Sequence, residues 1–124
     1  MLKISVEDFM RLTLLKSKLH RATVTEADLM YEGSISIDPA LCEAVGLVEY
    51  EQVDVYNCTN GERFTTYVIL GKSGQICVNG AAARLVAVGD QIIIAGYAQF
   101  EESERSTHRP KIVVLDAGNA VKNN

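Results

Sequence analysis

Residues 52–70, QVDVYNCTNGERFTTYVIL, decide the fold class. The first six alternate polar and apolar side chains, which is typical of a half-buried β-strand. Asn60-Gly61 favours left-handed backbone angles and predicts a tight hairpin, so residues 63–70 are expected to form the partner strand. This region predicts a mainly β protein.

Other short apolar runs, rich in Val, Ile and Tyr, recur along the chain between turn signals. Residues 71–74, GKSG, predict the next reversal, and residues 75–78 predict a short strand. Residues 91–97 and 112–115 are continuous apolar runs, which predicts strands buried on both faces. With a strand from about Met10 onward, at least six strands are expected, which favours a small barrel.

Helices are expected to be few and short. In DPALCEAVG, residues 38–46, Asp38 predicts an N-cap, proline the first turn and glycine the end of a helix over residues 39–45. A second short helix is expected at 81–85 and a single turn at 25–28. Residues 5–15 are ambiguous, because Ser5 and Asp8 three residues later suit a helix start whereas the leucines that follow suit a strand.

Length and charge limit the function classes. A chain of 124 residues makes one domain, and no apolar run is long enough to span a bilayer. A net charge of −4 and a pI near 5.1 argue against a nucleic-acid partner. Acidic residues at positions 7 and 8 break the apolar stretch of an export signal, so a cytoplasmic location is expected. The polar tail, residues 118–124, should be mobile.

Cysteine and histidine give little material for a metal centre. Cys42, Cys58 and Cys77 are odd in number and lack Cys-x-x-Cys spacing, which indicates neither a disulfide framework nor a zinc site. We expect them to be small buried apolar residues. His20 and His108 stand far apart in the sequence, and no metal is predicted.

The chemistry centres on Gly33-Ser34. Attack of the Ser34 hydroxyl on the Gly33 carbonyl would convert the amide into an ester. Backbone strain of ~1–3 kcal/mol supplies only about 5- to 150-fold towards that step, so donors to the developing oxyanion are needed as well. Taken alone, Gly-Ser is a common turn dipeptide, and an ordinary turn into a strand is the simpler interpretation.

Three further segments change that balance. On one strand Arg63 and Tyr67 share a face and Thr66 points to the other, unless a bulge brings them together. Arg63 suits a carboxylate, Thr66 offers a hydroxyl and Tyr67 a proton, although a surface arginine and a core tyrosine are the simpler interpretation. Residues 79–83, NGAAA, leave the backbone open at a helix start, where free N–H groups can hold an anion. Residues 18–21, KLHR, complete the polar set.

Together, these segments resemble the aspartate 1-decarboxylase family, whose members depend on a pyruvoyl group. The resemblance runs from about Met10 to Pro110 and implies a six-stranded double-psi β-barrel, residues 1–124, assembled as a homotetramer with active sites at subunit interfaces. It implies autocatalytic cleavage between Gly33 and Ser34 into chains 1–33 and 34–124, with Ser34 becoming the pyruvoyl cofactor. The mature carboxy-lyase would convert L-aspartate to β-alanine and CO2 for pantothenate and coenzyme A synthesis, with the ketone as electron sink.

The resemblance also assigns roles to single residues. Ser34 and Tyr67 are catalytic, and Tyr67 protonates the carbanionic intermediate. The resemblance assigns processing to Gly33, Ser34 and Thr66. It assigns substrate binding to Thr66, Gly80, Ala81, Ala82, Arg63 and Lys18, and a supporting role to His20, Tyr31 and Asn79.

Some points stay open at this level. The chain has more residues before Lys18 than the family pattern, and that extension could be a packing element, an alternative start or a regulatory appendage. Some family members mature with a separate acetyltransferase-like protein. A non-catalytic β-barrel binding module is the alternative function, while a serine hydrolase lacks its Gly-x-Ser-x-Gly signature. An arginine anchor selects a dicarboxylic amino acid more readily than it separates aspartate from glutamate.

Overall fold

The computed structural model describes residues 10–122, and these form eight strands, one α-helix and two short 3-10 helices. The mainly β class is therefore confirmed, with eight strands in the described range where the resemblance implied six. The strands are β1 Arg11–Thr23, β2 Glu26–Asp28, β3 Ser34–Ile37, β4 Gln52–Asn57, β5 Arg63–Leu70, β6 Ile76–Asn79, β7 Gln91–Glu101 and β8 Lys111–Val114. The helices are α1 Pro39–Val45, η2 Gly80–Leu85 and η3 Glu102–Glu104.

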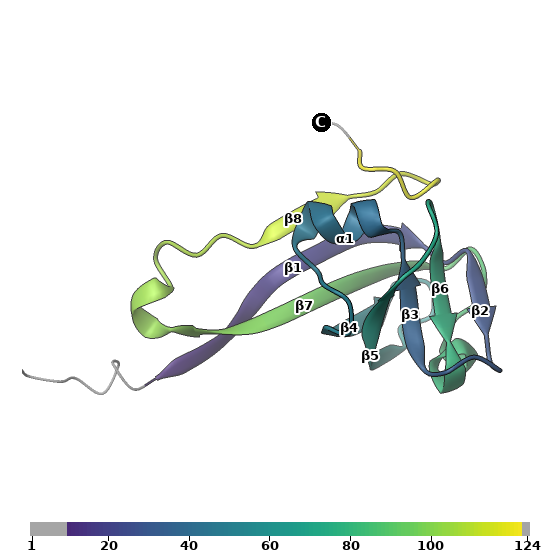
Figure 1. The fold of residues 1–124 in the computed structure, drawn as a ribbon, viewed down its shortest axis with the longest axis horizontal. Helices are drawn as coiled ribbons and strands as arrows, with labels where there is room; N and C mark the ends of the chain where they lie inside the picture. The colour runs from purple at the N-terminus through teal and green to yellow at the C-terminus, as the bar shows by residue number, and fades with distance from the viewer. Residues whose placement is uncertain (1–9, 123–124) are drawn as a thin grey trace, which may run out of the picture.

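All eight strands belong to one sheet with the order β2-β6-β3-β5-β4-β7-β1-β8 (Figure 1). The pairs β2–β6, β3–β5 and β1–β8 are parallel, and the other neighbours are antiparallel. The longest strands, β1 and β7, form a ribbon that reaches beyond the rest of the molecule, with η3 at its far end. The strand β3 lies inside the sheet, so both of its edges are paired.

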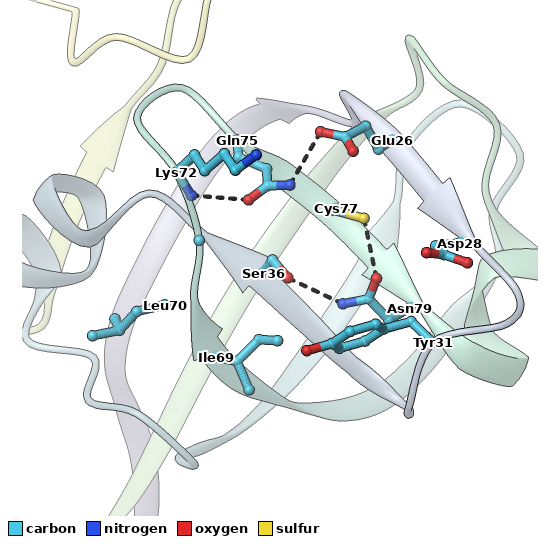
Figure 2. Close-up of a pocket in the computed structure, with 11 residues that line it drawn as sticks. Glu26, Asp28, Tyr31, Ser36, Ile69, Leu70, Lys72, Gln75, Cys77 and Asn79 are labelled. Atoms are coloured by element: carbon cyan, nitrogen blue, oxygen red, sulfur yellow. Dashed lines mark hydrogen bonds between the residues drawn. The ribbon is translucent and has the colours of Figure 1, made fainter.

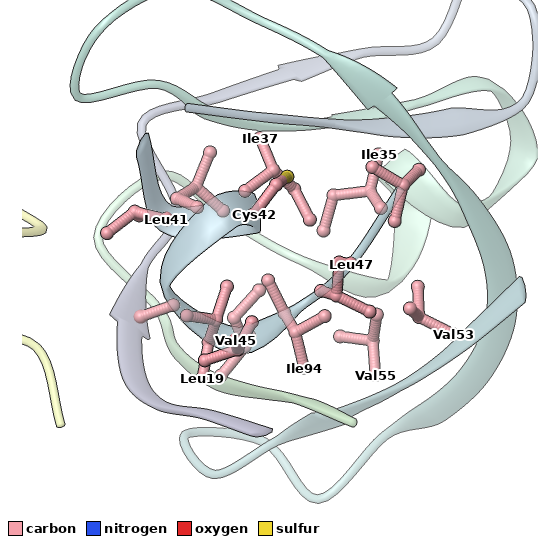
Figure 3. Packing of buried hydrophobic residues seen from close by; sticks show 14 of the residues in the cluster. Leu19, Ile35, Ile37, Leu41, Cys42, Val45, Leu47, Val53, Val55 and Ile94 are labelled. Atoms are coloured by element: carbon pink, nitrogen blue, oxygen red, sulfur yellow. The ribbon is translucent and has the colours of Figure 1, made fainter. Parts of the chain in front are cut away.

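The core fills the concave side of this sheet beneath α1 (Figure 3). The alternation of side chains along a strand determines which residues enter the core. Val53 and Val55 of β4 are buried, while Asp54 between them is only partly covered. Ile35 and Ile37 of β3 are fully buried in the same cluster. The other labelled members in Figure 3 are Leu19, Leu41, Cys42, Val45, Leu47 and Ile94.

The predicted helix at residues 39–45 is confirmed as α1. The Asp38 side chain accepts a hydrogen bond of 2.8 Å from the backbone N–H of Ala40, and Gly46 ends the helix in the left-handed conformation with φ 74°. The expected helix at 81–85 is present as η2, a 3-10 helix that begins one residue earlier. This helix begins directly after Asn79, the last residue of β6.

The hairpin between β4 and β5 is confirmed, but its loop is longer than the predicted tight turn. Gly61 adopts the left-handed conformation with φ 82°, whereas Asn60 does not. The side chain of Asn57 instead accepts a hydrogen bond of 2.9 Å from the backbone N–H of Thr59, and its backbone carbonyl accepts one of 2.8 Å from Gly61. These bonds stabilise a loop over residues 58–62.

Two local predictions at sheet edges were wrong. Residues 25–28 were expected to form a helical turn, but Thr25 bonds through its backbone N–H to the Ile76 carbonyl at 2.8 Å, and β2 follows as a parallel partner of β6. The strand β8 was expected to be buried on both faces, yet Ile112 is 49% exposed. Since β8 is the edge strand and pairs only with β1, one of its faces meets solvent.

The expected mobility of the tail is wrong for residues 118–122. Asn119 is buried, its side chain bonds the backbone N–H and carbonyl of Thr23 at 2.7 and 2.9 Å, and Leu115 bridges to Val121. Residues 123–124 lie outside the described range. At the other end, β1 begins at Arg11 as expected, while the extension and the possible cap at Ser5 lie outside the described residues.

Candidate functional site

The hydroxyl of Ser34, the first residue of β3, is buried and hydrogen-bonded. The residue is only 1% exposed, and its Oγ donates to the Glu32 carbonyl at 3.1 Å. Antiparallel pairing sets Ser34 opposite Asn79 of β6, whose Nδ2 donates to Ser34 Oγ at 3.0 Å. The same amide nitrogen donates to Ser36 Oγ at 3.1 Å. The oxygen next to the Gly33 carbonyl is thus held by two partners.

The backbone of Gly80 packs directly on the Gly33-Ser34 segment. Gly80 has φ 75°, and a Cβ there would lie 2.6 Å from Gly33 Cα and 3.3 Å from the Tyr31 carbonyl oxygen. Only glycine fits this approach without a shift of backbone. The segment 79–83 predicted from sequence to lie near the cleavage site is therefore brought to Gly33, and Asn79 and Gly80 are the residues that meet it.

Tyr67 lies beside Ser34 on the neighbouring strand. The parallel register sets Ile35 opposite Val68, so Ser34 and Tyr67, one residue earlier on each strand, share the outer face of the sheet. Tyr67 is 37% exposed in a shallow cleft of about 580 Å³ that it shares with Tyr50. A core position for this ring is therefore excluded, and the ring is open to a small molecule.

Thr66 points to the opposite face from Tyr67. The register between β4 and β5 runs without a shift from Gln52 opposite Tyr67 to Tyr56 opposite Arg63, so the bulge that would have brought Thr66 and Tyr67 together is absent from this pair. Thr66 is partly buried and lies two residues before Val68, which pairs with Ile35 of β3. Thr66 and Tyr67 therefore leave β5 on different faces of the sheet.

Arg63 lies apart from Ser34 in the same chain. It is exposed at the start of β5, four residues from Tyr67, which is roughly 13 Å along a strand. Its guanidinium stacks over the ring of Tyr56 at 5.1 Å from the centroid. The hydroxyls of Tyr56 and Tyr97 are 2.9 Å apart, and this hydrogen bond, with burial, raises the pKa of Tyr56 to about 12. Among residues 10–122, an aromatic ring contacts this cation and no carboxylate forms an ion pair with it.

Lys18 and His20 lie on a different part of the sheet from Ser34. Both belong to β1, which pairs with β7 and β8, and three strands separate β1 from β3 in the sheet. Burial, with the charges of Lys18 and Arg21, lowers the pKa of His20, and its Nδ1 is buried without a hydrogen-bond partner. One chain therefore assembles Ser34, Tyr67, Asn79 and Gly80, but not Lys18 or Arg63.

A cavity of about 390 Å³ adjoins Asn79 on the outer face of the sheet (Figure 2). Tyr31, Ser36, Cys77 and the carboxylates of Glu26 and Asp28 line this cavity. Of these, Tyr31 is 54% exposed. The sequence reasoning missed Ser36 and Cys77. The alternation of side chains along a strand could have located them, because it places Ser36 on the same face as Ser34 and Cys77 on the same face as Asn79.

The cysteines differ from one another. Cys42 and Cys77 are buried and Cys58 is exposed, so the expectation of three buried cysteines was wrong for Cys58, which lies in the loop after β4. Burial, with the nearby Asp38 and Glu51, raises the pKa of Cys42 to about 11. Within residues 10–122, no group of three His, Cys, Asp or Glu side chains is placed to hold a metal ion, and no helix is long and apolar enough to cross a membrane.

Comparison with known proteins bears directly on this arrangement. The family model described as aspartate decarboxylase matches residues 10–122, which includes every described segment of the site. The chain belongs to the aspartate decarboxylase family. Proteins named aspartate 1-decarboxylase are similar over nearly their whole length: 55% identity in Bdellovibrio bacteriovorus, over 90% of this chain and 90% of the relative, and 58% in Maricaulis maris, over 90% and 94%. The relative from Syntrophus aciditrophicus is 58% identical over 91% and 99%.

The family resemblance and the enzyme class, a carboxy-lyase, are thereby confirmed. Membership in the aspartate decarboxylase family supports decarboxylation of aspartate as the reaction. The roles of single residues stay predictions, and the geometry of one chain divides them into two groups. Ser34, Tyr67, Asn79 and Gly80 form a cluster around the bond after Gly33, while Arg63, Lys18 and His20 lie elsewhere on the sheet.

Proposed function

We propose that this chain cleaves itself between Gly33 and Ser34, and that the resulting enzyme decarboxylates L-aspartate to β-alanine and CO2 in pantothenate synthesis. One observation carries the proposal: a buried serine hydroxyl, held by Glu32 and Asn79, lies next to a glycine on which Gly80 packs. A structural serine at a strand entry needs neither the amide partner nor the glycine-on-glycine contact. The family relationship supplies the reaction class.

The cleavage chemistry uses atoms of this cluster. Ser34 Oγ attacks the Gly33 carbonyl carbon, its proton passes to the departing amide nitrogen, and an ester replaces the peptide bond. Elimination across the Cα–Cβ bond of residue 34 releases the carboxylate of Gly33, and addition of water with loss of ammonia leaves a pyruvoyl group at the new N-terminus. Thr66, which is partly buried on the strand next to β3, is the proposed hydroxyl donor to the oxyanion.

The residues around Ser34 fit such a group. The position is buried, Asn79 offers it an N–H donor, and no bulky side chain crowds it at Gly33 or Gly80. A pyruvoyl ketone supplies an electron sink for loss of CO2. Tyr67, exposed on the same face, is the proposed proton donor to the substrate carbon, and the backbone of residues 80–82 the proposed substrate contact.

The remaining substrate contacts are proposed to come from a second chain. Arg63 and Lys18 carry the positive charges that a dicarboxylic amino acid needs, and neither reaches Ser34 within one chain. The described surface also carries large apolar side chains that a second copy would cover, among them Met30 at 94%, Tyr50 at 72% and Val88 at 67% exposure. A homotetramer with shared sites and a cytoplasmic location complete the proposal, and a maturation partner is left open.

An intact mass spectrum of the purified protein tests the central claim. We expect two fragments that divide between residues 33 and 34, with the larger lighter than the plain hydrolysis product by one ammonia. A single unmodified chain after prolonged warm incubation would contradict unaided self-cleavage, and two fragments of full hydrolytic mass would contradict the pyruvoyl group. Release of β-alanine from aspartate, with glutamate as the comparison substrate, then tests the reaction.

A further inference from the structure

The amide of Asn79 is the centre of a buried hydrogen-bond network that includes a thiol. Cys77 Sγ donates to Asn79 Oδ1 at 3.1 Å, and Asn79 Nδ2 donates to Ser34 Oγ and Ser36 Oγ at 3.0 and 3.1 Å. All four residues are buried, with exposures between 1% and 8%. Figure 2 shows the thiol and the Ser36 hydroxyl on opposite ends of the amide. The amide of Asn79 therefore links the Cys77 thiol to the Ser34 hydroxyl.

The orientation of the Asn79 amide decides whether Ser34 Oγ faces a hydrogen-bond donor or an acceptor. A serine hydroxyl can donate or accept, so Ser34 and Ser36 tolerate either end of the Asn79 side chain. A thiol has a proton to donate and its sulfur accepts only weakly, so Cys77 is matched better by Oδ1 than by the NH2 group. Cys77 thus favours Oδ1 on its own side and leaves the NH2 group for the hydroxyls. Ser34, whose proton goes to the Glu32 carbonyl, then has a donor to its oxygen.

We propose that Cys77 is a positioning residue for self-cleavage: its thiol fixes the amide of Asn79, and the amide fixes Ser34 Oγ against the Gly33 carbonyl. The inference rests on the proposed function, since it assigns a role in the cleavage step. The environment keeps the thiol a donor. Burial raises the pKa of Cys77, and the carboxylates of Glu26 and Asp28 raise it further, so the sulfur retains its proton at neutral pH.

The rate of self-cleavage in Cys77 variants tests this role. Cys77→Ala removes the donor, and we expect cleavage about 2- to 12-fold slower, the range that one hydrogen bond is worth. Cys77→Ser restores a donor of similar size and should cleave at the rate of the unsubstituted chain. The readout is the fraction of uncut chain by mass against time. Cleavage of Cys77→Ala at the unsubstituted rate, or of Cys77→Ser as slowly as Cys77→Ala, would overturn the proposal.

Matched variants separate donation from packing. Cys77→Thr and Cys77→Val have nearly the same shape and differ by a hydroxyl, so the threonine variant should cleave faster; equal rates would contradict the role. The pair also serves if Cys77→Ala does not fold. Cys42→Ala removes another buried thiol, in α1, and should leave the rate unchanged. A slowed Cys42→Ala would mean that any loss of a core thiol has this effect.

A second readout does not depend on cleavage. In uncut Ser34→Ala protein labelled with 15N, the side-chain NH2 of Asn79 should give two sharp resonances that Cys77→Ser retains and Cys77→Ala broadens or shifts. Unchanged resonances in Cys77→Ala would contradict the inferred contact. If the unsubstituted chain never cleaves, the proposed function fails, whereas this measurement still decides whether the thiol orients the amide.

Discussion

The cluster around Ser34 and the surface around Arg63 lie on the same sheet but are built differently. Ser34 and Asn79 are buried, with their polar atoms bonded to each other within one chain. Arg63 is exposed, stacks over the ring of Tyr56, and lies four residues along β5 from Tyr67. Under the proposed function, one chain would contain what cleavage needs, whereas substrate recognition would require a second chain. Each prediction below either breaks or sharpens that division.

The largest effect is expected at Ser34. Because the ester requires its hydroxyl, Ser34→Ala should remain a single chain and form no β-alanine. Ser36→Ala removes the neighbouring hydroxyl on the same amide and should still cleave. The measurement is intact mass and β-alanine release; a cut, active Ser34→Ala protein would end the pyruvoyl proposal.

Next in size is the effect of mixing two damaged chains. Tyr67→Phe should cleave normally yet lose about 10²- to 10⁴-fold in turnover as a missing proton donor. Arg63→Gln should also cleave and lose about 10- to 150-fold in kcat/KM as a missing charged hydrogen bond. If the two side chains of a site come from different chains, co-produced variants will form some intact sites.

The mixture is assayed for β-alanine against each variant alone. Activity well above both parents would support shared sites. Activity no higher than the average of the parents would place Arg63 and Tyr67 of one site on one chain, which contradicts the division.

A smaller effect is expected when the glycine contact is filled. Gly80→Ala adds a left-handed alanine and a Cβ 2.6 Å from Gly33 Cα, so the free energy of unfolding should fall by about 2 kcal/mol or more. Gly61→Ala is the matched control, because Gly61 has φ 82° but open space around it. Urea unfolding of uncut Ser34→Ala protein measures both. Equal losses would show that the approach to Gly33 costs nothing beyond the backbone angle.

The smallest effect concerns a core thiol that belongs to neither region. The pKa of Cys42 is raised from 9.0 to about 11, so the unfolded chain loses this proton first as pH rises. The free energy of unfolding should therefore fall between pH 9 and 11, by about 1 kcal/mol at pH 10 from this group. Cys42→Ala should show a shallower decline in urea unfolding across that range. Parallel pH profiles would contradict the buried thiol's contribution.

How far the sequence predicts this molecule depends on where the physical signal lies. The helix at 39–45 and the strands at 52–57 and 63–70 follow from caps and alternation, which are local. The strand β2 and the packed Asn119 were missed because both depend on partners far along the chain, at residues 76–79 and 23. Short polar segments have no local signal that announces such partners.

The site divides in the same way. Gly33, Ser34 and residues 79–83 carry a recognisable pattern, and the structure brings them together. The contact between Cys77 and Asn79 is readable in principle from the period of two, but the chemistry of a buried thiol does not distinguish a packing residue from a donor. Arg63 and Tyr67 lie on one strand face as predicted, and four residues of strand separate them.

Cleavage before Ser34 would change how the two parts of the protomer are held together. A cut before Ser34 would leave residues 10–33 attached to the rest without a covalent link, through pairing of β1 with β7 and β8 and of β2 with β6, and through packing of Leu19 in the core. The mature protomer would then be a non-covalent complex of two chains. Its melting temperature would depend on protein concentration, and refolding from urea would require a bimolecular encounter that the uncut precursor never faces.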